Sequence, residues 1–444
     1  MKHDPPAQPV GRVNRRRPVQ FTFDGRSLMG FAGDTLASAL LRNGVHLVGR
    51  SFKYHRPRGI LSAGAEEPNA LVGVRRDDAR YTPNLRATQV EIYEGLEAHS
   101  QNRWPSLAFD FGAVNDVLSP FIPAGFYYKT FMWPRGAWKS LYEPRIRAAA
   151  GLGKSPTLAD PDRYTNRFAH CDVLVVGAGP AGLAAAIAAA RSGGRVIICD
   201  EQPELGGSLL SEPVGSTSAS IEGMPASAWL ARAIDTLTRD PRVTILSRTT
   251  AFGYFPHNMV GLNQRLTDHL AQPHPESPRE RQWQVRAEEV VLATGAIERP
   301  LVFPGNDRPG IMLAGAVRTY INRYGVTPGT RAVVVTACDE AYRAALDLHS
   351  AGVYVALIAD LRVTPSGPLV QAAQHAGLPV QAATTVVGTS GRLRVGTVEL
   401  ARLDPHGNVD ADAAVQTMPC DLVLMSGGYT PTVHLFSQSR GKLV

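Results

Sequence analysis

A short apolar run followed by closely spaced glycines is the feature of this sequence with the clearest chemical meaning. Residues 173–176 lead into an alanine-rich stretch through Gly177-Ala178-Gly179-Pro180-Ala181-Gly182. In such a strand–turn–helix unit, the first glycine permits a tight turn and the second lets a pyrophosphate approach the backbone. The third glycine lets the helix pack closely on the strand. Amides and a positive dipole at the helix N-terminus attract phosphate, so the motif predicts a dinucleotide site.

Two acidic residues stand at the end of the next predicted strand. Asp200 and Glu201 follow the apolar residues 196–199. A carboxylate at this position accepts hydrogen bonds from a ribose and disfavours a 2′-phosphate. We therefore expect NAD or FAD as the ligand, and not NADP.

Three further glycine-containing segments occur in the order found in two-dinucleotide-binding flavoproteins. They are Leu205-Gly206-Gly207-Ser208, Ala293-Thr294-Gly295-Ala296 and Ser426-Gly427-Gly428-Tyr429-Thr430-Pro431-Thr432. On these segments, the chain from about residue 170 to 444 resembles that class of protein. It departs from the class at residues 336–341, where the second fingerprint is replaced by a glycine-free segment with two acids. Side chains and negative charge would exclude a pyrophosphate there, so 300–420 is expected to be a degenerate second nucleotide-binding subdomain.

The elements that would position these segments follow from the hydrophobic pattern. Apolar strand candidates alternate with helical stretches, at residues 243–246, 283–285, 290–292, 333–336, 354–358 and 422–425. This alternation predicts an α/β fold with doubly wound, Rossmann-like parallel sheets over 169–444. Residues 1–98 are expected to form a small α+β domain. It would contain strands at 19–24 and 90–95 and a short helix after an Asp34 cap.

Composition excludes several classes of protein. The net charge of +7 falls to about +3 without the first 20 residues, which predicts a solvated basic arm and no nucleic-acid-binding body. The four cysteines are widely spaced and lack a CxxC pair, so a disulfide scaffold and a zinc site are not expected. The long apolar run 173–190 is interrupted by glycines and no secretory signal precedes it. We expect a cytoplasmic protein with reduced thiols and no membrane contact.

Residues 99–168 form a segment rich in aromatic residues and proline. The aromatic residues are Trp104, Phe109, Phe111, Phe121, Phe126, Tyr127, Tyr128, Phe131, Trp133, Trp138 and Tyr142. Their weak periodicity indicates an irregular linker. Two interpretations stay open: packing on the chain's own domains, or a subunit interface, where aromatic side chains are enriched.

The first 98 residues resemble the ferredoxin-like domains of amine-oxidising complexes. The resemblance rests on Gly33-Asp34-Thr35-Leu36-Ala37 and on residues 53–59, Lys-Tyr-His-Arg-Pro-Arg-Gly. In cluster-bearing members a run of cysteines follows, whereas residues 62–69 of this chain contain none. Because thiolates ligate such clusters, we expect no iron–sulfur cluster.

No catalytic or metal-binding constellation is predicted elsewhere. His257, His269 and His274 lie in the polar, proline-containing stretch 257–282, which we expect to be an ordinary exposed connection. We therefore nominate no catalytic residue and no metal ligand.

Several segments together resemble the alpha subunits of heterotetrameric sarcosine oxidases. They are residues 51–59, 125–153, 200–210 and 427–443. The resemblance implies a complex with beta, gamma and delta subunits that converts sarcosine and oxygen, with tetrahydrofolate, to glycine, hydrogen peroxide and methylene-tetrahydrofolate. It also implies NAD on the alpha chain, amine oxidation on FAD in beta, and an FMN at the alpha–beta interface. Family members carry a second, folate-binding half, so the chain is expected to be a fragment or a truncated product.

The same resemblance carries over a set of nucleotide contacts. They are Gly177, Gly179, Ala181, Gly182, Asp200, Glu201, Gly207, Ser208, Ala251, Thr294, Gly295, Gly428 and Thr432. The main alternative is the FAD-binding component of an opine or cyanide-forming amino-acid dehydrogenase. A free-standing pyridine-nucleotide oxidoreductase and a degenerate structural protein are further alternatives.

Overall fold

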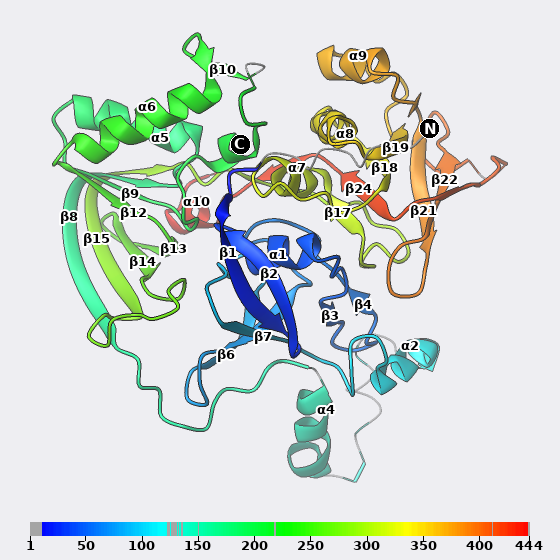
Figure 1. Cartoon of the computed structure of the whole chain (residues 1–444), viewed down its shortest axis with the longest axis horizontal. Coiled ribbons are helices and arrows are strands. Elements are labelled where there is room, and N and C mark those ends of the chain that lie inside the picture. Colours follow the sequence, from blue (N-terminus) through cyan, green and yellow to red (C-terminus); the bar gives the residue numbers. More distant parts are fainter. Residues whose placement is uncertain are drawn as a thin grey trace.

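The computed structural model describes residues 11–121, 125, 131, 133–134, 136–149, 151–216, 219–410 and 412–442. Three units built of strands and helices follow one another along the chain (Figure 1). The N-terminal domain lies between the other two, which are the first and second nucleotide-type subdomains. Within the described residues, no helix is long and apolar enough to cross a membrane.

The N-terminal domain is built on a five-stranded mixed sheet. Its strand order is β2-β1-β7-β5-β6, with β1 antiparallel to β2 and parallel to β7. Its helix α1 (Leu36–Arg42) packs on β2, and its buried residues are apolar except for Ser38. The strands are β1 (Asn14–Phe23), β2 (Arg26–Ala32), β5 (Leu71–Arg75), β6 (Tyr81–Arg86) and β7 (Leu96–Ser100), beside a short ladder of β3 (Gly49–Arg50) and β4 (Pro57–Arg58).

Three sequence-based expectations for this domain are wrong. The basic residues 15–17 lie exposed on strand β1 and not on a free arm; residues 1–10 lie outside the described part of the chain. Residues 90–95 form a turn before β7, because the adjacent residues Ile92 and Tyr93 are both buried and cannot alternate between two faces. Thr35, and not Asp34, caps α1.

A buried carboxylate organises the loop 61–70. The Oε2 atom of Glu67 accepts hydrogen bonds from the amides of Leu61 (2.9 Å) and Ser62 (2.7 Å). Its Oε1 atom accepts from the amides of Asn69 (2.8 Å) and Ala70 (3.0 Å). Glu67 is 1% exposed, so these four amides replace the hydration that its charge loses on burial.

The aromatic segment leaves the body of the protein and exposes large apolar side chains. Its described turns are η1 (Phe111–Ala113), α2 (Val114–Val117), η2 (Ser119–Phe121), the π-helix η3 (Trp138–Tyr142) and α4 (Glu143–Ala149). Phe121 and Trp133 are each 81% exposed and Trp104 is 68% exposed. This exposure argues against packing on the chain's own domains for these three residues. Phe126, Tyr127 and Tyr128 lie outside the described residues.

The first nucleotide-type subdomain is built on a six-stranded sheet of order β12-β9-β8-β15-β14-β13. The first four strands of this order are parallel, and β13 and β14 add an antiparallel extension. Its elements are β8 (Tyr164–Val176), α5 (Pro180–Arg191), β9 (Val196–Cys199), η4 (Gly207–Ser211), β10 (Ser220–Ile221), β11 (Met224–Pro225), α6 (Ala226–Arg239), β12 (Val243–Leu246), β13 (Thr249–Phe255), β14 (Met259–Arg265) and β15 (Glu280–Leu292). The two strands expected at 283–285 and 290–292 are parts of β15.

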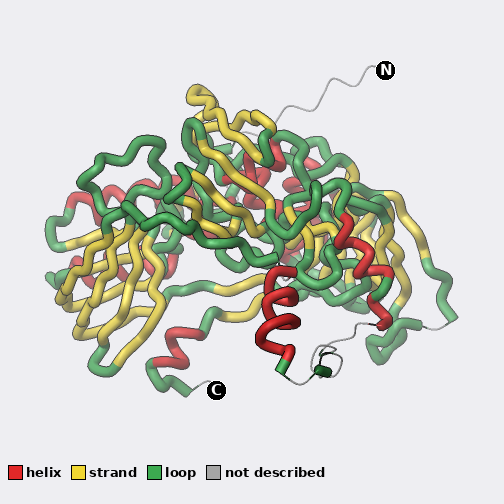
Figure 2. The backbone as a smooth tube through the Cα atoms, turned by 90° about the horizontal axis from the view of Figure 1, so that it is seen from below, coloured by secondary structure: helices red, strands yellow, loops and turns green. Residues whose placement is uncertain are grey.

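Alternating side chains of the parallel strands bury both faces of this sheet. Val175 and Ile198 pack with α5 and α6 on one face. Leu174 and Ile197 point to the other face and pack with Val260 of β14, because the antiparallel extension curls over that side (Figure 2). The expectation of an exposed connection over 257–282 is therefore wrong, since this stretch contains β14 and the start of β15.

The second nucleotide-type subdomain has a parallel sheet of order β17-β24-β18-β19-β20. Its elements are β16 (Ala296–Glu298), β17 (Ile311–Leu313), α7 (Ala314–Asn322), β18 (Arg331–Thr336), α8 (Glu340–Ser350), β19 (Tyr354–Asp360), α9 (Pro368–His375), β20 (Val380–Gln381), β21 (Thr384–Ser390), β22 (Thr397–Arg402), β23 (Gln416–Pro419), β24 (Leu422–Ser426) and β25 (Tyr429–Pro431). The following helix, α10 (His434–Gln438), packs on β13 of the first subdomain. Strands β16 and β25 pair with each other. The predicted α/β nucleotide-binding architecture is confirmed.

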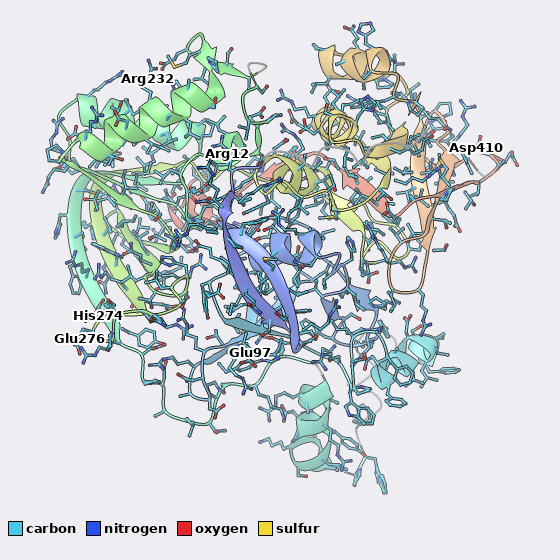
Figure 3. The ribbon with its side chains drawn as sticks, viewed as in Figure 1. Arg12, Glu97, Arg232, His274, Glu276 and Asp410 are labelled. Atoms are coloured by element: carbon cyan, nitrogen blue, oxygen red, sulfur yellow. The ribbon has the colours of Figure 1, made fainter. Side chains whose placement is uncertain are left out.

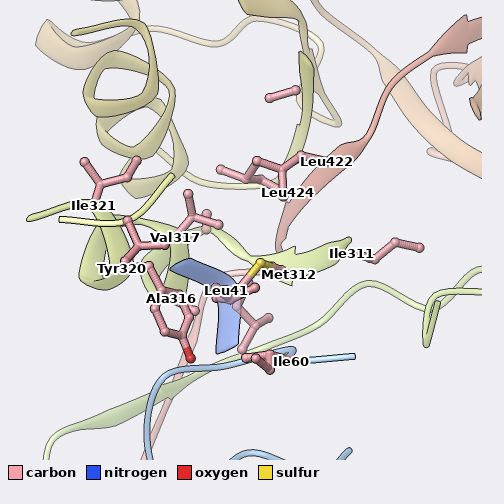
Figure 4. Packing of buried hydrophobic residues seen from close by; sticks show 14 of the residues in the cluster. Leu41, Ile60, Ile311, Met312, Ala316, Val317, Tyr320, Ile321, Leu422 and Leu424 are labelled. Carbon is pink, nitrogen blue, oxygen red and sulfur yellow. The ribbon is translucent and has the colours of Figure 1, made fainter. Parts of the chain in front are cut away.

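One apolar core joins the N-terminal domain to the second subdomain. Leu41 and Ile60 lie in the same buried cluster as Met312 and Tyr320 (Figure 4). The Tyr320 hydroxyl also donates to the carbonyl oxygen of Ser62 at 2.8 Å. The loop organised by Glu67 is therefore part of a packed junction and not a free surface loop. Elsewhere in the chain, all four cysteines are unpaired thiols.

Candidate dinucleotide site

The glycine turn between β8 and α5 has the geometry that the fingerprint predicts. Gly177 has a φ of +98°, and a Cβ atom there would lie 2.2 Å from the carbonyl oxygen of Ala293. A Cβ atom on Gly182 would lie 1.8 Å from the carbonyl oxygen of Gly177. Both positions therefore require glycine for the turn and for close helix packing.

Gly179 differs from these two glycines because space opens beside it. Its φ of −70° is accessible to any residue, and the nearest atom to an added Cβ is the Gly207 Cα, at 4.0 Å. It stands at the N-terminal cap of α5, a twelve-residue helix with no side-chain cap. The uncapped amides of its first turn leave donors for an anion. The residues present therefore fit the pyrophosphate of a dinucleotide.

The Gly206-Gly207 turn forms the second wall of this opening. The amide of Gly206 donates to the carbonyl oxygen of Ala178 at 2.8 Å, which joins the two turns. A Cβ atom on Gly207 would approach the Gly179 Cα to 2.8 Å. Ser208 follows in η4 and is exposed. Glycine at 207 keeps the two backbones close without filling the space in front of α5.

Asp200 lies at the end of the strand, as predicted, and it also holds the glycine turn by hydrogen bonds. One carboxylate oxygen accepts from the Ala178 amide at 2.6 Å, and the other accepts from the Gln202 amide at 2.8 Å. Burial raises the pKa of Asp200, and burial together with the charge of Asp200 raises the pKa of Glu201. Each oxygen of Asp200 keeps a lone pair free, so ribose contact by Asp200 and Glu201 stays a prediction.

Two arginines beside these acids were missed by sequence reasoning. Arg265 donates to the carbonyl oxygen of Glu201 at 3.3 Å. Arg323 donates to the side chain of Gln202 at 3.2 Å, and its charge partly opposes the rise that burial causes in the pKa of Asp200. Both arginines lie more than 60 residues from the acids in the chain, and no local motif marks them.

The remaining predicted residues meet where β16 and β25 connect the two subdomains. The Thr294 hydroxyl donates to the carbonyl oxygen of Thr432 at 2.7 Å, and the Thr432 amide donates to that of Gly295 at 3.0 Å. Gly428 accepts from the Arg299 amide on the same ladder. Ala251 lies on β13, two residues after Thr249, whose amide donates to the carbonyl oxygen of Asp200. The described contacts do not join Ala251 directly to the glycine turn.

The corresponding positions of the second subdomain are satisfied by the chain itself. Asp360, at the end of β19, accepts from the Tyr342 hydroxyl at 2.8 Å and from Arg362 at 2.7 Å. Arg362 also donates to Asp339, which lies in the turn between β18 and α8. Arg362 therefore neutralises both Asp339 in the turn and Asp360 at the strand end. A second dinucleotide would need free donors and acceptors at these positions. This geometry favours a degenerate second site.

A buried carboxyl group on β16, that of Glu298, was also missed by sequence reasoning. The Oε2 atom of Glu298 accepts from the Gly315 amide at the start of α7, at 2.8 Å, whereas its buried Oε1 atom has no hydrogen-bond partner in the described structure. Burial raises the pKa of this carboxyl group from 4.5 to about 7. Glu298 therefore favours its protonated form in the folded protein.

This shift predicts a pH-dependent stability. Between pH 4.5 and pH 7 the unfolded chain ionises Glu298 while the folded chain stays protonated, so the free energy of unfolding decreases by about 3 kcal/mol as pH rises. A Glu298→Gln chain cannot ionise and should lose this contribution. We therefore expect the free energy of unfolding, measured in urea, to decrease from pH 5 to pH 8 by about 2 kcal/mol more in the native chain than in the Glu298→Gln chain. Glu288→Gln, which removes an exposed carboxyl on β15, is the control; parallel pH curves for all three chains would contradict the assignment.

Comparison with known proteins places this fold and site in a class of oxidoreductases. Residues 171–443 match the family described as pyridine nucleotide-disulphide oxidoreductase, and the chain belongs to this family. More particularly, the chain is similar to the N-terminal part of sarcosine oxidase alpha subunits.

The identity to these relatives extends along nearly the whole chain. It is 51% to the sarcosine oxidase alpha subunit of Rhizobium meliloti (strain 1021) over 98% of this chain and 42% of the relative. It is 40% to the subunit of the same name from Corynebacterium sp. (strain U-96), over 98% of this chain and 40% of the relative. The chain thus spans about two fifths of the length of these relatives.

More distant similarity supports the fold and one alternative. An opine oxidase subunit of Agrobacterium tumefaciens (strain Ach5) is 32% identical over 47% of this chain and 40% of the relative. The crystal structure of L-proline dehydrogenase from P.horikoshii superposes with a TM-score of 0.59 at 18% identity, covering 98% of this chain and 66% of that chain. The latter match supports the fold alone.

The comparisons correct the expectation for the N-terminal domain. Residues 16–103 match a family described as a 2Fe-2S iron-sulfur cluster binding domain. This match contradicts the expectation of no iron–sulfur cluster, which we withdraw. The matched range contains no cysteine, so the thiolate ligands that such clusters use do not come from it.

Proposed function

We propose that the chain is the NAD-holding part of the alpha subunit of a sarcosine oxidase complex. The observation that carries the proposal is the open glycine turn at the N-terminus of α5, together with a second subdomain in which Arg362 pairs with the acids of the corresponding turn and strand end. The similarity to sarcosine oxidase alpha subunits over 98% of the chain supports the same function. The complex would act on sarcosine, oxygen and tetrahydrofolate to give glycine, hydrogen peroxide and methylene-tetrahydrofolate.

The chain's own residues would bind and orient the nucleotide. The amides at the start of α5 and the glycines 177, 179, 182 and 207 would hold the pyrophosphate. Asp200 and Glu201 would hold the adenosine ribose, and Thr294, Gly295, Gly428 and Thr432 would line the other end of the site. Bound NAD supplies a nicotinamide that can accept a hydride. Amine oxidation itself is assigned to FAD on a beta subunit, so this chain provides no catalytic residue.

The aromatic segment is proposed as the contact with the beta subunit. Trp104, Phe109 and Phe111 form an exposed cluster with ring centroids 4.9 and 5.0 Å apart. Contiguous exposed aromatic surface of this kind marks interaction sites. We further propose three domains, at residues 1–98, 99–168 and 169–444. An FMN would lie at the interface with the beta subunit, and the gamma and delta subunits would bind elsewhere. The complex would be cytoplasmic.

Identification of the bound nucleotide tests this function. The purified chain is denatured and the released nucleotide is identified by mass, after its visible spectrum has been recorded. We expect one dinucleotide per chain, because the acids of the second subdomain's turn and strand end are paired with Arg362. We expect this dinucleotide to be NAD, without flavin absorption, as the resemblance to sarcosine oxidase alpha subunits implies. Release of FAD would overturn the proposal in favour of an FAD-binding opine oxidase component, which the similarity to the Agrobacterium tumefaciens protein favours as the second candidate. Absence of any nucleotide would overturn both.

A further inference from the structure

Two connected cavities lie between the N-terminal domain and the antiparallel extension of the first sheet. Their volumes are about 220 and 400 Å³, and they share Arg76, Arg80, Tyr93 and Arg279. One wall comes from β5 to β7, and the other comes from β13, β14 and the connection to β15. Figure 3 labels a residue on each wall of the larger cavity, Glu97 on β7 and His274 in the connection. Both volumes are far larger than the 10–15 Å³ or so that one water needs.

The smaller cavity has an excess of positive charge. Six arginines and three acids line it: Arg76, Arg80, Arg86, Arg248, Arg265 and Arg279, with Glu91, Asp268 and Glu280. Arg248 forms a bidentate pair with Glu91 at 2.6 and 2.8 Å. Arg279 pairs with Asp268 at 2.8 Å, and Arg80 pairs with acids outside the cavity.

The other three arginines are held by backbone carbonyl oxygens. Arg76 donates to the carbonyl oxygens of residues 267, 268 and 270. Arg265 donates to those of residues 89 and 201, and Arg86 donates to that of Glu67. Among the ion pairs of the described residues, none pairs these three with a carboxylate within 4 Å. A backbone carbonyl satisfies a donor without neutralising its charge. Of these three arginines, Arg265 and Arg86 lower the pKa of nearby Glu201 by their charge, and Arg76 lies at the cavity without a carboxylate within 4 Å in the described structure.

Two residues that line this cavity, Tyr93 and His269, each have a buried side-chain polar atom without a hydrogen-bond partner in the described structure. Tyr93 is 8% exposed, its hydroxyl has no partner, and the Arg76 guanidinium lies 4.7 Å from its ring centroid. The Nδ1 atom of His269 is also without a partner. Burial raises the pKa of Tyr93, so its hydroxyl keeps a proton to donate. Unmade hydrogen bonds of buried groups are costly, and the Tyr93 hydroxyl calls for an acceptor that the described residues do not supply.

We propose that the smaller cavity binds a small polyanion through phosphate or carboxylate oxygens. Guanidinium groups match both kinds of oxygen in charge and planar geometry. The Tyr93 hydroxyl would donate to the same ligand. The site is separate from the glycine turn, although it adjoins the adenosine end of the dinucleotide site through the contact of Arg265 with Glu201. It does not depend on which nucleotide the glycine turn holds.

Calorimetric titration with inorganic phosphate and, separately, with citrate tests the site. The purified chain is titrated at constant ionic strength, and the Gly179→Asp chain is titrated in parallel to remove anion binding at α5. We expect binding of at least one anion in both chains. Phosphate binding alone assigns phosphate ligands, citrate binding alone assigns polycarboxylates, and either supports the site. Binding of neither anion, or loss of binding in Gly179→Asp, overturns it.

Two variants locate the binding within the cavity. Tyr93→Phe removes only the unpartnered hydroxyl, and Arg86→Gln removes a charge held by one backbone contact. Each is expected to weaken binding about tenfold or more, since one hydrogen bond to a charged group is lost. Tyr354→Phe and Arg232→Gln, both on exposed residues away from the cavity (Arg232 is labelled in Figure 3), are the matched controls. Unchanged affinity in both cavity variants would overturn the proposal.

Discussion

A Gly179→Asp chain is expected to fold normally and to lose its nucleotide. The backbone at Gly179, with φ −70° and ψ −177°, suits any residue, and the nearest atom to an added Cβ is the Gly207 Cα, at 4.0 Å. The new carboxylate would occupy the space in front of α5 where the pyrophosphate binds. Two like charges about 4 Å apart repel by roughly 4 kcal/mol at an intermediate dielectric constant. Nucleotide affinity should therefore decrease about 1,000-fold.

Comparison of liganded and ligand-free chains separates this effect from misfolding. The nucleotide released on denaturation is quantified per chain, and urea unfolding is measured for both chains after the nucleotide has been removed. The variant should carry almost no nucleotide yet unfold like the stripped native chain, because only the linked stabilisation is lost. Gly396→Asp is the control, since it adds the same charge at another open, exposed glycine before β22. Full nucleotide occupancy in Gly179→Asp would refute binding at this turn.

Only the middle glycine allows this separation. An alanine at Gly177 or Gly182 would place its Cβ atom within 2.2 Å of a backbone oxygen. Such variants would disturb the packing of α5 on β8 and lose the ligand indirectly. The contrast explains why three glycines of one motif have different physical roles.

Local chemistry explains how much of the site the sequence could predict. The fingerprint, the strand-end acids and the Gly-Gly turn each depend on residues close together in the chain, and the structure brings these groups into contact. The strands expected at 333–336 and 422–425 are confirmed for the same reason, because continuous apolar runs mark buried parallel strands. The strand expected at 243–246 is also confirmed, as the partly exposed edge strand β12. Nucleotide contact by these residues stays a prediction.

Contacts between distant residues explain what the sequence could not predict. Arg248 and Glu91 are 157 residues apart and Arg76 contacts residues almost 200 positions away. These contacts fold the stretch 257–282 against the N-terminal domain and enclose the arginine-lined cavity. No local pattern indicates such a wall, so the stretch resembled an exposed connection. The ferredoxin-like resemblance of the first 98 residues was found from the sequence, but the lack of cysteines led to the wrong expectation that no cluster is bound, whereas residues 16–103 match a cluster-binding family.

Replacement of Glu67 by glutamine is expected to destabilise the chain by about 3 kcal/mol or more. The native carboxylate accepts four backbone hydrogen bonds, two on each oxygen, at 2.7–3.0 Å. Glutamine keeps one acceptor and turns an N–H₂ group toward two of these amides. Two charge-assisted hydrogen bonds, each worth about 1.5–3 kcal/mol, are lost and two buried donors stay unpaired. Urea unfolding monitored by circular dichroism measures the change in free energy.

The neighbouring residue provides a matched control for this prediction. Glu66→Gln makes the same chemical change on an exposed side chain and should alter the free energy of unfolding by less than about 0.5 kcal/mol. Equal effects of the two variants would show that the four amides do not depend on a charged acceptor. We expect the large loss of stability to be confined to Glu67→Gln, because Glu67 holds a loop at a packed junction. The loop it braces supplies the Ser62 carbonyl that binds Tyr320 and the Leu61 carbonyl that binds Leu313, so its collapse loosens the junction between the N-terminal domain and the second subdomain.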